Sequence, residues 1–272
     1  MVSSIFLPAR AENNIPESGD KLTEQEILQK KLNDFYTTTL AAAKPLFDDK
    51  HLAELSAPLL ISISDKYLTA PVRIMFVGKE TNGWWGKLRA YYAAEDALPG
   101  LMTRYQQQMG MQKWPGRFFP MLSRTARELA GAPADAIAWT NLLRTDWEHG
   151  KGFSRNSKQF SDALTKMSQE ILRFEVELLE PDVIIFACGA SYDSVIKATF
   201  PVRTNSEAIE KRALWQFNLG NILCFRAQHP QAMRRRNSAL KPVGAYYADI
   251  FARVKANFPR VYDAVNMSVE SI

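Results

Sequence analysis

Three side chains that could share acid, base and hydrogen-bonding chemistry follow separate apolar runs of the chain. Glu80 and His229 each come two residues after such a run, and Asn141 lies near the end of another. A carboxylate, an amide and an imidazole in one pocket could transfer protons and hold a polar substrate. Taken singly, each has a plainer interpretation: a solvated or helix-capping carboxylate, an amide that bonds the backbone, and a turn histidine before Pro230.

The elements that must position these side chains are strands that alternate with helices. The predicted strands cover 72–78, 136–143, 182–189 and 221–227, and 59–64 is a candidate for a further short strand. Helical periodicity covers 23–44, 87–112, 116–130, 158–180, 190–198 and 243–256. Buried strands alternating with helices predict a three-layer α/β/α sandwich with a central, mainly parallel four-stranded sheet. The carboxyl ends of parallel strands share one edge, so the three side chains should converge there.

Two domains or segments are expected. Residues 1–70 read as an N-terminal helical extension, in which Thr23 and Glu26 form a capping-box pattern. Residues 71–272 read as the α/β domain that carries the candidate chemistry.

Composition excludes several classes of protein. The chain has 272 residues, 46% of them hydrophobic, and a net charge of +5. No apolar run approaches the roughly 18 residues of a spanning helix, and the N-terminus lacks the pattern of a secretory signal. Cys188 and Cys224 are too few for a zinc or iron–sulfur site of four thiolates. We expect a cytoplasmic monomer with no membrane partner, no metal and no cofactor.

The residues at the strand ends resemble the motifs of the uracil-DNA glycosylase superfamily. That family's first core strand leads into forms such as GQDPY, GMNPG or GEAPG, and here it leads into Gly78–Asn82. The family's late motif, HPSPL followed by basic residues, is matched by His229–Met233 and Arg234. Asn141 stands where an LLN-type segment of the family carries its base-reading asparagine. Order and spacing agree over about residues 70–256.

The resemblance implies a DNA N-glycosylase that flips a uracil or another damaged base out of single- or double-stranded DNA and excises it. Asn141 would read the base edge, and His229 would bond the pyrimidine oxygen that gains charge. Glu80 takes the place of the residue that positions water or steadies the cationic sugar. The other implied site residues are Asn82 for catalysis, Gly78, Lys79, Trp84, Trp85 and Phe118 for the base, Met233 as an apolar wedge, and Arg234, Arg235 and Arg236 for phosphates.

The sequence also departs from the family pattern. Thr81 replaces the proline that follows the catalytic position, and Ala232 replaces the second proline of the late motif. The target base therefore stays open, and two alternatives remain. One is a glycosylase-like protein that binds nucleic acid without excision, and the other is a hydrolase of small molecules or nucleotides on a similar sheet.

Overall fold

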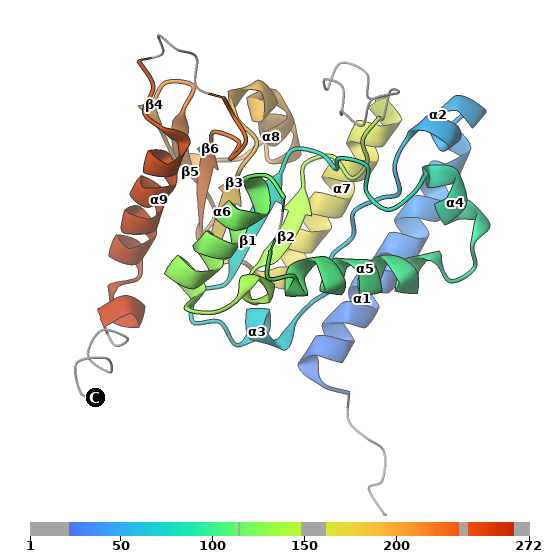
Figure 1. Ribbon diagram of the computed structural model, residues 1–272, viewed down its shortest axis with the longest axis horizontal. Helices are drawn as coiled ribbons and strands as arrows, with labels where there is room; N and C mark the ends of the chain where they lie inside the picture. Colours follow the sequence, from blue (N-terminus) through green and yellow to red (C-terminus); the bar gives the residue numbers. More distant parts are fainter. Residues whose placement is uncertain (1–21, 114, 148–161, 234–238, 264–272) are drawn as a thin grey trace, which may run out of the picture.

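The computed structural model describes residues 22–113, 115–147, 162–233 and 239–263, and a six-stranded sheet lies at its centre (Figure 1). The strands are β1 (Ile74–Gly78), β2 (Ala138–Asn141), β3 (Val183–Phe186), β4 (Thr204–Glu210), β5 (Leu214–Leu219) and β6 (Ile222–Ala227). They follow the order β2-β1-β3-β6-β5-β4 across the sheet. The strands β2, β1, β3 and β6 run parallel, whereas β5 and β4 are antiparallel to their neighbours.

The α/β class is confirmed, but the expected sheet of four strands is wrong because the sheet has six. The four predicted strands form its parallel part. The additional strands are β4 and β5, and the reversal from β5 to β6 is made by Gly220 and Asn221, with φ of +57° at Gly220. Edge strand β4 is exposed over most of its length, so its sequence carries no apolar signal.

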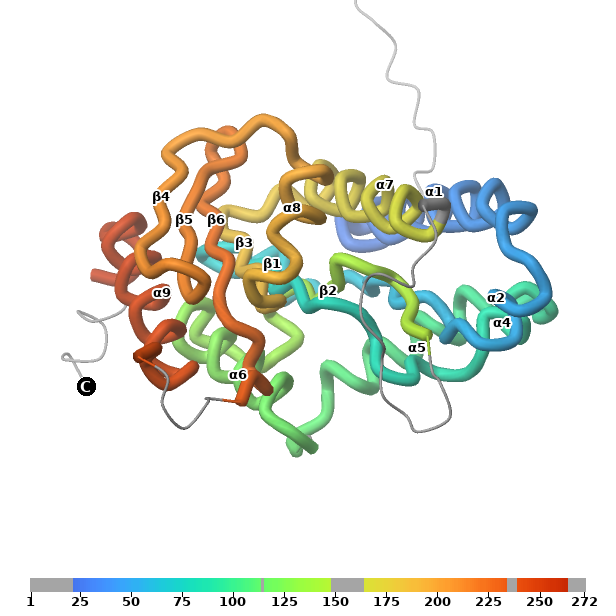
Figure 2. Tube along the Cα trace, turned by 90° about the horizontal axis from the view of Figure 1, so that it is seen from above, coloured from blue at the N-terminus to red at the C-terminus, as the bar shows by residue number. Residues whose placement is uncertain are grey.

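Helices cover both faces of the sheet (Figures 1 and 2). One face carries α1 (Glu24–Ala43), α7 (Asp162–Leu179) and α8 (Asp193–Thr199), and the other carries α6 (Phe118–Thr125) and α9 (Val243–Asn257). Beside the β2 edge lie α2 (Asp49–Glu54), α4 (Leu88–Ala93) and α5 (Ala97–Gly110), and α3 (Asp65–Leu68) lies below the amino ends of the strands (Figure 1). Single-turn segments are η1 (Lys44–Leu46), η2 (Ala126–Ala130), η3 (Ala134–Ala136) and η5 (Ala190–Tyr192). Within the described ranges, no helix has the length and apolar character needed to cross a membrane.

Helix α1 begins where the capping-box pattern predicts. The Thr23 hydroxyl accepts the N–H of Glu26 at 3.2 Å, and the Glu26 carboxylate accepts the N–H of Thr23 at 2.8 Å. Farther along, Phe35 stacks on Phe174 of α7 with ring centroids 3.8 Å apart. The buried face of α1 therefore joins the same hydrophobic core as the sheet.

A buried ion pair lies beneath the end of β2. The Arg144 guanidinium donates to both carboxylate oxygens of Glu175, at 2.8 and 2.7 Å, and neither side chain is exposed. Tyr36 of α1 and Thr140 of β2 also donate to Glu175, at 2.7 and 2.9 Å. Burial, followed by the negative charge of Glu175, raises the pKa of Tyr36. Because a buried ion pair is costly to desolvate, these additional hydrogen bonds help to hold it in place.

The apolar run 59–64 does not form the candidate strand. The N–H groups of Ile61 and Ile63 donate to a tyrosine and a glutamine side chain of α1, at 3.2 and 2.7 Å. The outer edge of β2 is taken by Tyr105 of α5, whose hydroxyl accepts the N–H of Trp139 at 2.8 Å and donates to its carbonyl at 3.0 Å. Side chains therefore satisfy backbone groups that another strand would pair.

Candidate functional site

The carboxyl ends of the parallel strands open onto a cleft of about 990 Å³. Lys79 and Glu80 reach it from the end of β1, and His229 reaches it from the end of β6. Gly189, after β3, forms part of its wall. Two of the three predicted chemical groups, the carboxylate and the imidazole, thus line one cavity.

His229 is held as a neutral hydrogen-bond donor. Its Nδ1 accepts the N–H of Gln231 at 3.2 Å, so the proton of the neutral ring is assigned to Nε2. The imidazole stacks on Phe118, with ring centroids 5.5 Å apart and planes 23° apart. Burial, together with the positive charge of Lys79, lowers the pKa of His229 to about 3. The ring can therefore donate a hydrogen bond at neutral pH without carrying a charge.

Asn141 lies beside this imidazole–phenyl stack rather than on the cleft wall. It pairs in register with Gly78 across β2 and β1, and its side chain packs against Gly78, where a Cβ would overlap Oδ1. Phe118 closes the same space, because its Cζ would stand 3.1 Å from that Cβ. Asn141 is 2% exposed, and its Nδ2 has no hydrogen-bond partner within the described residues. This amide is positioned and still has donor capacity.

Glu80 and Tyr192 both line the cleft and share a hydrogen bond. Burial raises the pKa of Tyr192, and the charge of Glu80 and a hydrogen bond to it raise that pKa further. Tyr192 comes from η5, after β3, and sequence analysis did not single it out. Because β1 and β3 are adjacent parallel strands, the segments that follow them lie close together. Only that pairing could have indicated that Tyr192 lies near Glu80.

Thr81 anchors the loop after β1 instead of facing a substrate. Its hydroxyl donates to the carboxylate of Asp146 and lies 2.9 Å from the hydroxyl of Ser56. The same carboxylate accepts the N–H of Gly83 at 3.0 Å. Asp146 is fully buried, and Asn82 stands exposed between the two anchored residues. Thr81 thus has a structural partner, which sequence analysis did not identify.

The aromatic candidates occupy three different environments. Trp84 is 8% exposed and packs edge-on against Trp139 in the core. Trp85 is 49% exposed, and its ring would stand 3.2 Å from a Cβ on Gly100 of α5. Of the three candidates, Phe118 is the one that stacks on His229.

Positive charge dominates the cleft. Its lining includes one carboxylate, Glu80, and four cations, which are Lys79, Lys211, Arg212 and Lys241. Lys211 and Arg212 belong to the turn between β4 and β5, so they were missed together with that hairpin. Met233 also lines the cleft and is 91% exposed. The predicted phosphate contacts Arg234, Arg235 and Arg236 lie outside the described residues.

The two thiols and the metal-ligating side chains offer no second centre in the described part of the chain. Cys188 and Cys224 are buried and unbridged, and burial raises the pKa of both. No group of three His, Cys, Asp or Glu side chains in the described ranges could hold a metal ion. A scan of protein-family models finds none that matches the chain, and a search of curated proteins finds no match.

Proposed function

We propose that this protein is a DNA N-glycosylase that flips a uracil or another damaged or modified base into the cleft and excises it. The observation that carries the proposal is the neutral His229 imidazole, stacked on Phe118 in a cleft lined by four cations and one carboxylate. A neutral donor suits an oxygen that becomes charged during reaction, and the cations suit a substrate with phosphates.

The proposed reaction breaks the C–N bond between base and sugar. The base leaves with the bonding electron pair, and His229 Nε2–H donates to the base oxygen that gains negative charge. Lys79, whose charge already acts on His229, adds to the positive potential there. Water adds its oxygen to the sugar carbon, and Glu80 takes the water proton. Flipping itself costs a few kcal/mol, which contacts in the site must offset.

Base recognition and DNA contact complete the proposal. Asn141 supplies the amide N–H that reads the base edge, since its Nδ2 has no partner in the part of the chain that the structure describes. Phe118 must shift to admit a base between Asn141 and His229, and it then offers its ring for stacking. Exposed Met233 is the candidate wedge for the space that the flipped base leaves. Asn82, exposed in the loop after β1, stays the third catalytic candidate, and Arg234, Arg235 and Arg236 would contact phosphates.

A single-turnover assay tests the proposal. Labelled single and double strands would carry one uracil, hypoxanthine or hydroxymethyluracil, and alkali would reveal abasic sites. His229→Gln should slow excision by about 10²- to 10³-fold, as loss of one oxyanion donor does. Glu80→Gln should slow it at least as much. The matched control is His51→Gln on α2, away from the cleft. Intact DNA after stoichiometric wild-type protein would overturn excision of these bases.

The second candidate is a nucleic-acid-binding protein without excision activity. The hydrogen bond between Tyr192 and Glu80 favours it, because it engages the carboxylate that would take the water proton. Its signature is salt-dependent DNA binding with no product at any base tested. A Tyr192→Phe variant separates the two candidates: faster excision would support the enzyme, and unchanged binding without product would support the binding protein.

A further inference from the structure

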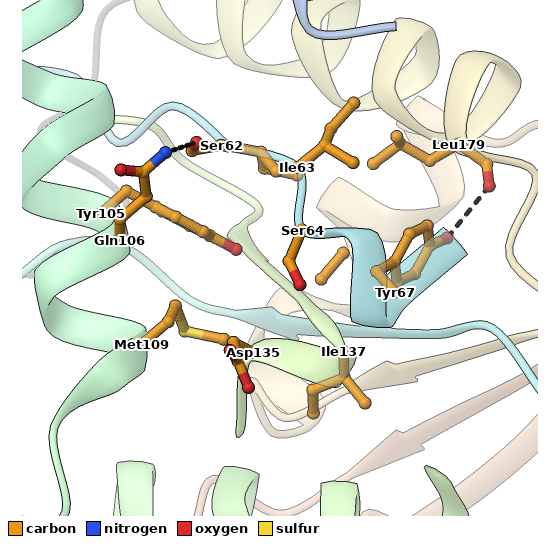
Figure 3. A pocket seen from close by; sticks show the side chains of 12 residues that line it. Ser62, Ile63, Ser64, Tyr67, Tyr105, Gln106, Met109, Asp135, Ile137 and Leu179 are labelled. Carbon is orange, nitrogen blue, oxygen red and sulfur yellow. Dashed lines mark hydrogen bonds between the residues drawn. The ribbon is translucent and has the colours of Figure 1, made fainter. Parts of the chain in front are cut away.

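A second cavity, of about 210 Å³, lies at the opposite end of β2 from Asn141. Figure 3 shows its lining, which includes Tyr105 and Met109 of α5, the chain at Ser62–Ser64, and Asp135. It shares no lining residue with the large cleft. Its ligand would therefore be separate from the substrate of the proposed function.

One wall of this cavity presents an unsatisfied carboxylate oxygen. Asp135 Oδ1 is buried and has no hydrogen-bond partner within the described residues. Its Oδ2 accepts a hydrogen bond from Lys66 at 2.7 Å. Because a buried acceptor without a partner is destabilising, a donor from a ligand or from water is expected at Oδ1. Lys66 already offsets the negative charge, so the donor need not be a cation.

The opposite wall presents the backbone of Ser62. The flanking Ile61 and Ile63 turn both their N–H and their C=O toward side chains of α1. Alternate residues of an extended segment direct these groups to opposite sides, so those of Ser62 face away from α1. Ser62 is 6% exposed and lines the cavity, and within the described ranges no hydrogen bond to its N–H or C=O is found.

The size of the cavity limits the ligand to one ring. Its volume of about 210 Å³ exceeds the roughly 150 Å³ of an apolar cavity that holds benzene, and it is below the roughly 300 Å³ of the smallest drug-sized sites. The remaining walls include Ile137, Met109 and two tyrosine rings, which suit an apolar body. We propose that this cavity binds an uncharged single-ring molecule that carries both a hydrogen-bond donor, for Asp135, and an acceptor, for Ser62, as an aromatic amide does.

Benzamide is a suitable probe, and the full chain labelled with ¹³C at the methionine methyl groups reports its position. We expect a Kd of about 1 mM or tighter, in the range of small fragments. Ring protons of benzamide should show nuclear Overhauser contacts to the Met109 methyl, which Met109→Leu assigns. Toluene lacks the polar groups, and benzoate lacks a hydrogen-bond donor for Asp135, so both should bind at least about tenfold more weakly.

Two variants test the role of the carboxylate. Asp135→Ala should weaken benzamide binding about tenfold, the equivalent of one hydrogen bond to a charged acceptor. Lys66→Met breaks the same ion pair but keeps the Asp135 carboxylate as acceptor. The affinity of this variant for benzamide should therefore stay within about twofold of wild type. Equal losses in both variants, contacts only to other methionines, or no binding at about 10 mM benzamide would overturn the proposal. The last result would mean that water alone fills the cavity.

Discussion

The amide of Asn141 lies where a side chain on Gly78 would begin. A Cβ on Gly78 would overlap Oδ1 of Asn141 and stand 3.1 Å from Phe118. Gly78→Ala should therefore displace the amide and cost about 1–3 kcal/mol in the free energy of unfolding, as overpacking does. Chemical denaturation measures this cost. The control is Gly110→Ala at the end of α5, where nothing lies within 4 Å of the new carbon and the change should be small or stabilising. Equal stability of both variants would contradict the packing at Gly78.

The ionisation of His229 gives a second prediction. Its folded-state pKa is about 3, against 6.5 for an ordinary histidine. Between these values the unfolded chain binds a proton that the folded chain does not, so acidification favours unfolding. Wild type should lose up to about 1.4 kcal/mol more than His229→Gln for each pH unit below 6.5. Denaturation at several pH values measures the difference, and nitrogen NMR should show an Nε2–H ring that does not titrate from pH 5 to 8. A titration midpoint near pH 6.5 would show that the ring is not buried as described.

The buried carboxylate of Asp146 gives a third prediction. It accepts hydrogen bonds from Thr81 and Gly83, which flank the exposed Asn82. Asp146→Ala should leave these donors unpaired and destabilise the protein by about 2–5 kcal/mol. The matched control is Asp34→Ala, which removes an exposed ion pair with Lys30 and should cost less than about 1 kcal/mol. Thermal unfolding compares the two. If Asp146→Ala costs no more than its control, the loop is not held by this carboxylate.

The cations of the cleft give a fourth prediction. Substituting Arg212 or Lys241 by methionine should weaken DNA binding about equally for all sequences. Each lost phosphate contact should also reduce the slope of log affinity against log salt by about 1. Fluorescence anisotropy at several salt concentrations measures both effects. Lys30→Met on α1 is the control, because Lys30 lies outside the cleft and is 68% exposed. Identical salt slopes for all three variants and wild type would show that DNA does not pass through the cleft.

Much of the fold could be predicted because the four parallel strands are buried on both faces and read as continuous apolar runs. The hairpin β4–β5 lacks that signal in β4, which lies at the exposed edge. The Gly220–Asn221 pair between β5 and β6 is typical of a two-residue hairpin turn and indicates this reversal of the chain. Lys211 and Arg212 lie in the turn of the β4–β5 hairpin, which brings them to the cleft. Without that hairpin, the predicted site did not include them.

The candidate site could be predicted in part for the same reason. Strand ends identify Glu80 and His229, because the order of parallel strands brings them to one edge. The sequence does not indicate which of the adjacent residues Trp84 and Trp85 is buried. In the structure Trp84 packs in the core and Trp85 is half exposed. Asp146 could not be identified either, since its role depends on its contact with Thr81, which is 65 positions away along the chain.

The buried pair of Arg144 and Glu175 links the stability of the first long helix to that of the sheet. Glu175 lies on α7 and accepts further hydrogen bonds from Tyr36 of α1 and Thr140 of β2, so the pair joins three elements that are far apart in the sequence. If α1 detached, Glu175 would lose the Tyr36 hydroxyl and the ion pair would become exposed to water on one side. Local opening of α1 should therefore be almost as rare as unfolding of the whole molecule. Amide hydrogens of α1 should exchange with solvent as slowly as those of the central strands, although this helix lies outside the sheet.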